Sequence, residues 1–204
     1  MALVVLAAGL SAAAPSEARR KPVFEDAIDV IRERTTVSVP AAVSVPAAGS
    51  VEVAFSPDEG AEHLVVKVID SAKSELRVLS YSFTSIPVVK ALIRARHRGV
   101  DVKIVADPKD NLRSGNTKAR AALGALVNAG CEVRTIGAYA IHHDKVIIAD
   151  RRTVELGSFN YSDAAAHRNS ENVLVNWQNS ALAEAYLLHF ERNYAKSVAY
   201  QKGY

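Results

Sequence analysis

The sequence contains a single cysteine, Cys131, among 204 residues, so no disulfide can form within the chain. Its stability must therefore come from a packed core. Hydrophobic residues make up 49% of the chain and charged residues 23%, values near the globular average that exclude wholesale disorder. The segment AGCEVRTI is typical of a strand start, where Cys131 would be a small buried residue. The length fits one main domain and is too short for two of ordinary size.

The chain has no large excess of charge of one sign, and it has few long apolar runs. The 25 Lys and Arg residues against 22 Asp and Glu residues give a net charge of +3, which permits a polyanionic partner without indicating one. The one long apolar run, Ala2–Leu10, continues into small residues and Ser16-Glu17-Ala18, an A-x-A-like cleavage site. We therefore expect residues 1–18 to be a signal peptide. The mature chain is expected to be periplasmic or secreted, without stable membrane insertion.

Residues 19–49 are predicted to be a linker or a poorly ordered N-terminal segment. They contain a tandem repeat of VSVPAA, at residues 37–42 and 43–48, whose two prolines favour a semi-extended chain. The folded domain is expected over residues 50–204.

Strand patterns alternate with helix patterns across that domain. Strands are predicted at 51–55, 76–83, 100–107, 131–136, 145–150, 153–158 and 171–177, and helices at 56–73, 86–99, 117–130 and 180–195. The first helix is expected to open with a capping box at Ser56–Glu59. Strands joined through helices imply crossover connections, whereas the hairpin near Asp150 adds antiparallel neighbours. The fold class is therefore α/β, with a mixed, largely parallel β-sheet and helices on both faces.

The stretch HHDKVIIADRRTVELGSFN, residues 142–160, holds the candidate chemistry. On a strand, side chains two apart share a face, so His143 and Lys145 point one way and His142 and Asp144 the other. A histidine beside an ammonium group suits an anionic substrate, because the imidazole can act as a nucleophile or proton donor. A metal is not required, since Lys145 would oppose a second cation. No cofactor is expected.

The spacing His143-x-Lys145-x4-Asp150-x6-Gly157-Ser158-x-Asn160 resembles the HxKxxxxDxxxxxxGSxN signature of the phospholipase D superfamily. The segments VAFSP, YSFTS, RGVDVKIVAD and NSENVLV are similar to its small bacterial nuclease branch, exported endonucleases with one signature per chain. The resemblance covers roughly residues 51–194.

The resemblance implies a role for each matched residue. His143 would attack phosphorus and form a phosphohistidine, while Lys145 and Asn160 would hold the non-bridging oxygens. Ser158 would assist the phosphate pocket. Asp150 is counted in the catalytic set through the signature, although its role in the family is mainly structural. Glu171 would orient His143 by accepting a hydrogen bond from its other ring nitrogen, or would simply cap or solvate a strand start.

A second His-x-Lys does not occur in the chain. A phosphohistidine cycle needs a second group that protonates the leaving oxygen and then activates water. In a two-fold dimer, residues near the axis face their own copies, so His143 of the partner subunit can be that group. We therefore expect a homodimer with a shared site.

Other charged and aromatic residues have both a functional and a structural interpretation. Either a rim that follows the phosphate backbone or a solvent-exposed loop could be formed by Lys109, Arg113, Lys118 and Arg120, and the sequence favours neither. A structural role is favoured for Arg94, Arg96 and Arg98, near the end of their helix. Tyr81 and Phe83 are expected in the core or as a pocket wall, and His167 is a weak candidate for the cleft mouth.

The function expected from these residues is a metal-independent phosphodiesterase that cleaves DNA, with RNA as a second candidate substrate. The alternative is a phospholipase D acting on phospholipid head groups. It would need an apolar, membrane-seeking rim, and we find no loop rich in Trp and Leu, because the only tryptophan, Trp177, closes a strand. A non-catalytic phosphate or nucleic-acid binding module is disfavoured, since a binder could lose His143 at little cost.

Overall fold

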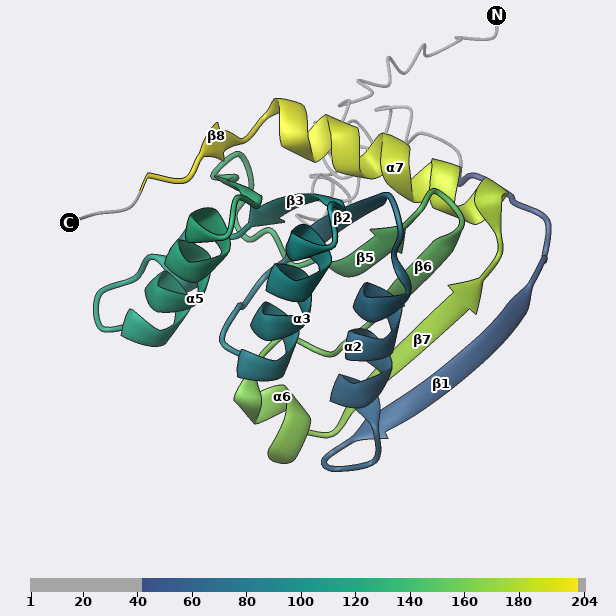
Figure 1. Ribbon diagram of the computed structural model, residues 1–204, viewed down its shortest axis with the longest axis horizontal. Helices are drawn as coiled ribbons and strands as arrows, with labels where there is room; N and C mark the ends of the chain where they lie inside the picture. The colour runs from purple at the N-terminus through teal and green to yellow at the C-terminus, as the bar shows by residue number, and fades with distance from the viewer. Residues whose placement is uncertain (1–41, 202–204) are drawn as a thin grey trace, which may run out of the picture. The chain divides into compact units, whose positions relative to one another are not determined.

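The computed structural model describes residues 42–201 (Figure 1). The predicted signal peptide and most of the predicted linker lie outside the described residues. The residues from Val43 onward belong to one compact unit, and everything below concerns that unit. No helix or strand occurs in it before β1.

Eight strands and six helices follow one another within residues 42–201. They are β1 (Ser50–Ser56), α2 (Ala61–Ser71), β2 (Glu75–Ser80), α3 (Ile86–His97), β3 (Asp101–Ala106), α4 (Pro108–Asn111), α5 (Thr117–Asn128), β4 (Glu132–Thr135), β5 (Lys145–Ala149), β6 (Thr153–Gly157), α6 (Asp163–His167), β7 (Glu171–Trp177), α7 (Ser180–Ala195) and β8 (Val198–Ala199). Each predicted strand and helix of the domain is present. The short elements α4, α6 and β8 are additions that the sequence pattern does not predict.

The predicted start of α2 at Ser56 is wrong. Ser56 is the last residue of β1, where it pairs with Glu171 of β7, and its Oγ donates to the Asn169 carbonyl at 3.2 Å. The helix begins only at Ala61, after Gly60, whose φ of 90° is a left-handed conformation that suits glycine. Strand pairing therefore overrides the local capping signal.

All eight strands form one sheet in the order β1-β7-β6-β5-β2-β3-β4-β8. The mixed α/β sheet is confirmed, but its parallel part is smaller than expected. Only the β2–β3 and β3–β4 pairs are parallel, and the other pairs are antiparallel. The reason is that α2 connects β1 to β2 with β7, β6 and β5 between them, so the crossover does not produce a parallel neighbour.

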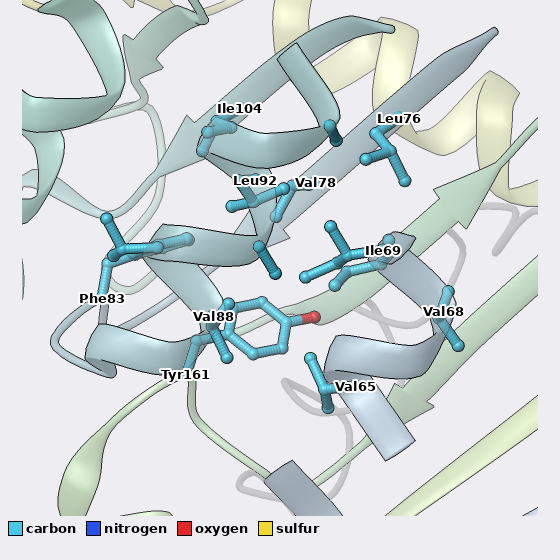
Figure 2. Close-up of a cluster of buried hydrophobic side chains, with 14 of the residues drawn as sticks. Val65, Val68, Ile69, Leu76, Val78, Phe83, Val88, Leu92, Ile104 and Tyr161 are labelled. Carbon is cyan, nitrogen blue, oxygen red and sulfur yellow. The ribbon is translucent and has the colours of Figure 1, made fainter. Parts of the chain in front are cut away.

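Helices cover both faces of the sheet, as predicted. Figure 1 shows α2, α3 and α5 on one face and α7 on the other. On the first face, Val65 and Ile69 of α2 meet Val88 and Leu92 of α3 above Val78 of β2 (Figure 2). The second cluster consists of Leu79, Val105, Ile136, Val146, Ile148 and Val154 from the sheet with Ala183, Leu187 and Phe190 from α7. Cys131 is buried at the start of β4, as predicted, and burial raises the pKa of its thiol to about 11.

The face under α7 is covered only in part. Val51, Val53 and Phe55 of β1 are 62%, 56% and 50% exposed, whereas Ala54 between them packs toward α2. Leu174 of β7 pairs with Val53 and is half-buried. These residues, Val51, Val53, Phe55 and Leu174, form an apolar strip, here called the β1 face. No helix of the described part of the chain covers it.

Candidate active site

The site forms where the end of β2 meets the start of β5. These neighbouring strands are antiparallel, and Ser80 pairs with Lys145. Tyr81 directly follows β2, and the exposed ring of His143 precedes β5, so their centroids lie 4.8 Å apart. Tyr81 is thus a wall of the site, whereas Phe83 is fully buried in the core.

Lys145 is buried beside His143. Its Nζ donates to the His143 carbonyl at 2.8 Å and lies 5.1 Å from the centroid of the Tyr81 ring. Burial lowers the pKa of the ammonium, while the nearby Glu171 and Asp144 carboxylates act to raise it. Two of its three N–H groups remain for an anion.

The predicted division of faces is confirmed. His143 and Lys145 both contact Tyr81, whereas the buried His142 has its Nδ1 3.5 Å from the carboxylate of Asp144. His142 and Asp144 therefore serve to hold the segment rather than to face a substrate.

The turn after β6 carries the second half of the signature. Gly157 pairs with Val173, and a Cβ at Gly157 would lie 2.2 Å from the Asn172 carbonyl oxygen, so only glycine fits. The register Val146–Leu156 places Gly157 opposite Lys145. Sheet pairing thus brings the two halves of the signature together.

The side chain of Asn160 makes no hydrogen bond within residues 42–201, and its buried Oδ1 has no partner. An amide without internal partners is available to a ligand. The hydroxyl of Ser158 is committed, since it donates to Glu171 Oε2 at 2.6 Å and accepts from the Asn172 amide. A phosphate contact from Ser158 therefore stays a prediction.

The predicted bond between Glu171 and His143 is not made within the chain. The two carboxylate oxygens of Glu171 accept from Ser158 and from Asn169 Nδ2, the latter at 3.0 Å. Local donors around the start of β7 take this carboxylate, which the sequence alone does not reveal. Glu171 still acts on the site, because its charge favours the charged form of Lys145.

Asp150 is removed from the catalytic set. It lies at the other end of β5, about 17 Å along the strand from Lys145. Its carboxylate accepts from the backbone N–H groups of Lys73, Ser74 and Glu75 at 2.8–3.2 Å and from the Ser74 hydroxyl. Although burial alone would raise its pKa, these bonds lower it below the ordinary value. Asp150 fixes the chain before β2.

The arginines near the end of α3 are structural, as predicted. Arg94 and Arg98 bind Asp70, at 2.7 and 3.5 Å, and Arg96 donates to the Gly130 carbonyl.

The other basic candidates divide between the site and a separate groove. Lys109 donates to the Ala140 carbonyl at 2.8 Å, just before the His142–His143 segment, while Arg120 binds loop carbonyls and Arg113 lies 3.8 Å from Asp110. A groove of about 690 Å³ between α3, α5 and α6 is lined by Lys118 and His167. No signature residue lines this groove, so it is not the candidate active site.

Residues that the sequence did not single out hold the His142–Asp144 segment from behind. Asp107 accepts from the backbone N–H of His142 at 2.8 Å, and Asp144 bonds to Nε2 of His189 on α7 at 2.9 Å. Asp107 directly follows the parallel strand β3, and this position is a detectable signal. The position of His189 gives no such signal.

Within the described residues no group of three or more His, Cys, Asp or Glu side chains could hold a metal ion. No helix there is long and apolar enough to cross a membrane.

Comparison with known proteins identifies this arrangement. A family model described as "Cardiolipin synthase, PLD-like domain" matches residues 65–194. The structure of Nuc, a phospholipase D family member from Salmonella typhimurium, superposes with a TM-score of 0.72 at 45% identity, covering 74% of this chain and 98% of that one.

Two further relatives carry names that refer to phospholipids. A "Phospholipase D" of Rickettsia bellii is 38% identical over 65% of this chain, and a "Mitochondrial cardiolipin hydrolase" of Danio rerio is 33% identical over 56% of it. The matches span 63% and 46% of the length of those two proteins.

Proposed function

The chain belongs to the phospholipase D superfamily, and we propose that it is a metal-independent phosphodiesterase that cleaves nucleic acid, chiefly DNA. The observation that carries the proposal is the pairing of His143 with the buried Lys145, on strands whose register sets Gly157 opposite Lys145, three residues before Asn160, whose Oδ1 has no partner within residues 42–201. The 45% identity to Nuc over nearly all of that chain supports the nuclease branch. A lipid substrate is the competing outcome, given the names of the curated relatives.

In the proposed reaction, an imidazole nitrogen of His143 attacks phosphorus, a P–N bond forms and the P–O bond to the leaving group breaks. Lys145 and Asn160 hold the non-bridging oxygens, where negative charge is concentrated. His143 of the partner subunit gives a proton to the leaving oxygen. Water then attacks phosphorus, that same imidazole takes the proton of the water, and the P–N bond breaks.

Two observations support a dimer around this site. The chain carries one His-x-Lys, so a second imidazole must come from another copy. No helix of residues 42–201 covers the apolar β1 face. This face adjoins the site, because Phe55 pairs with Asn172, whose amide donates to Ser158. Exposed apolar surface rimmed by polar groups favours association. A second copy seated on this face would bring two sites toward one axis.

Export to the periplasm or the medium is also proposed, because the chain opens with an apolar run and an A-x-A-like site. The N-terminus of the protein recovered from cells that express the whole sequence would then be Arg19. Recovery of the intact Met1 form in the cytoplasm would contradict export.

The test of substrate class compares plasmid DNA with phospholipid vesicles, both in excess chelator, for the native protein and the His143→Ala variant. We expect the native protein to cut DNA and leave lipid intact, and the variant to cleave neither substrate. Lipid cleavage with intact DNA would reverse the proposal. Loss of all activity on chelation would remove the metal-free mechanism.

A further inference from the structure

Glu155 is a fully buried acid that the proposed chemistry does not use. It lies at the middle of β6 and faces the core beneath α2 and α3, between Ile147 of β5 and Val175 of β7. Its Oε2 accepts from the hydroxyl of Tyr161 at 2.8 Å, and its buried Oε1 has no partner within residues 42–201. No cation within residues 42–201 pairs with it. A carboxyl group so placed costs stability, which an apolar side chain would not.

Tyr161 connects this acid to both halves of the site. It directly follows Asn160, and its ring is fully buried among the apolar side chains of α2 and α3, near Val65 and Val88 (Figure 2). Its backbone carbonyl accepts from the N–H groups of Thr84 and Ser85, both at 2.8 Å.

The loop held by those two bonds runs on from Tyr81, the wall behind His143 and Lys145. The backbone of Tyr161 thus fixes the Tyr81 loop, and its side chain is fixed in turn by Glu155. Tyr161 therefore links the turn that carries Asn160 to the loop that carries Tyr81.

We propose that Glu155 is a positioning residue: through its hydrogen bond to the Tyr161 hydroxyl, it holds the Gly157–Asn160 turn and the Tyr81 loop in the geometry that transfers the phosphoryl group. The inference rests on the proposed phosphodiesterase activity but not on the identity of the macromolecular substrate. The carboxyl is neutral in this role, because burial raises its pKa to about 8. The ionisable group facing it is Tyr161, and Asp144 lies close enough to act on the Tyr161 hydroxyl.

Hydrolysis of a small chromogenic phosphodiester, which measures the chemistry without macromolecular binding, tests this role. Tyr161→Phe keeps the ring and loses the bond, so we expect kcat to fall at least about tenfold with KM within about twofold. Glu155→Gln retains an acceptor for the hydroxyl and should keep kcat within about threefold of native. Glu155→Met with Tyr161→Phe should lose no more than Tyr161→Phe alone, because both remove one bond.

The matched control is Val175→Ala, which alters the core beside Glu155 without touching the bond and should leave kcat unchanged below its melting temperature. Native kcat in the double variant would overturn the proposal, as would an equal loss in Val175→Ala.

Amide hydrogen exchange of residues 82–85 and 158–162 gives a readout without catalysis. Exchange there should rise in Tyr161→Phe and stay native in Glu155→Gln, and unchanged exchange in Tyr161→Phe would contradict the role. A native protein that cleaves no diester would instead contradict the proposed function, while the exchange result would still decide the role of Glu155.

Discussion

The rings of His143 and Tyr81 lie 4.8 Å apart, centroid to centroid, with their planes inclined by 58°. The same tyrosine ring lies 5.1 Å from the ammonium nitrogen of Lys145. One side chain from the end of β2 therefore supports both the candidate nucleophile and the candidate phosphate ligand. The site depends on this contact between neighbouring strands as much as on the signature itself.

Replacing the Tyr81 ring should separate these roles. Tyr81→Phe keeps the aromatic face and should retain most of kcat, whereas Tyr81→Ala removes the wall and should lower kcat by roughly ten- to a hundredfold. Steady-state kinetics on the same diester measures both. Equal activity of the Ala and Phe variants would show that the wall is dispensable.

Asp150→Asn should weaken the fold and leave the chemistry intact. The change weakens up to four hydrogen bonds to residues 73–75, so we expect a loss of about 1–3 kcal/mol in the free energy of unfolding, with native kcat below the melting temperature. Urea denaturation measures the loss of stability. Kinetics at a temperature well below the melting transition measures kcat. A large fall in kcat in a fully folded variant would return Asp150 to the catalytic set.

The same carboxylate predicts a response to acid. Its pKa in the folded state lies below the ordinary value of 3.8, so its contribution to stability is present above pH 3.8 and is lost as the pH falls through the folded pKa. The difference in stability between native protein and Asp150→Asn should therefore shrink in that acidic range. A difference that stays constant would contradict the assignment.

Glu155 predicts the opposite dependence on pH. Its folded pKa of about 8 exceeds the ordinary value of 4.5, so the folded state keeps a proton that the unfolded chain releases. Stability from this group is complete below pH 4.5 and is lost as pH rises to about 8, with a slope near 1.4 kcal/mol per pH unit. Urea titrations at pH 5 and pH 8 should show the native protein losing stability relative to Glu155→Gln. A stability difference between the two proteins that is the same at pH 5 and at pH 8 would mean that Glu155 is already ionised at pH 5.

A charge on the β1 face should separate the subunits. Phe55→Glu places a carboxylate in an apolar contact, so we expect a folded monomer with little activity. Ile86→Glu is the matched control, since Ile86 is 66% exposed at the start of α3, away from the β1 face. Sedimentation velocity gives the mass of each. A dimeric, active Phe55→Glu protein would move the interface elsewhere.

The sequence predicted what alternation and spacing can encode. The shared face of His143 and Lys145 follows from strand period, and the pairing of β5 with β6 follows from the hairpin. It did not reveal that Ser56 ends a strand, because the partner, Glu171, lies more than a hundred residues away.

Side-chain contacts in the site were equally hidden. The bond between Asp144 and His189 joins positions 45 residues apart, and neither residue type at that spacing signals it. The sequence predicted that Glu171 accepts from His143, whereas the donor in the structure is the Ser158 hydroxyl. Which donor reaches the carboxylate depends on the folded geometry. The burial of Glu155 likewise depends on which face of β6 the helices cover.

The central claim, that His143 attacks phosphorus, is tested most directly by mass spectrometry after a denaturing quench at alkaline pH, during single turnover with a 5′-labelled oligonucleotide in excess chelator. We expect a transient acid-labile phosphoryl adduct on the peptide that contains His143, formed and lost at rates consistent with kcat, and absent from His143→Ala. Complete cleavage with no adduct, or an adduct on another residue, would contradict the account.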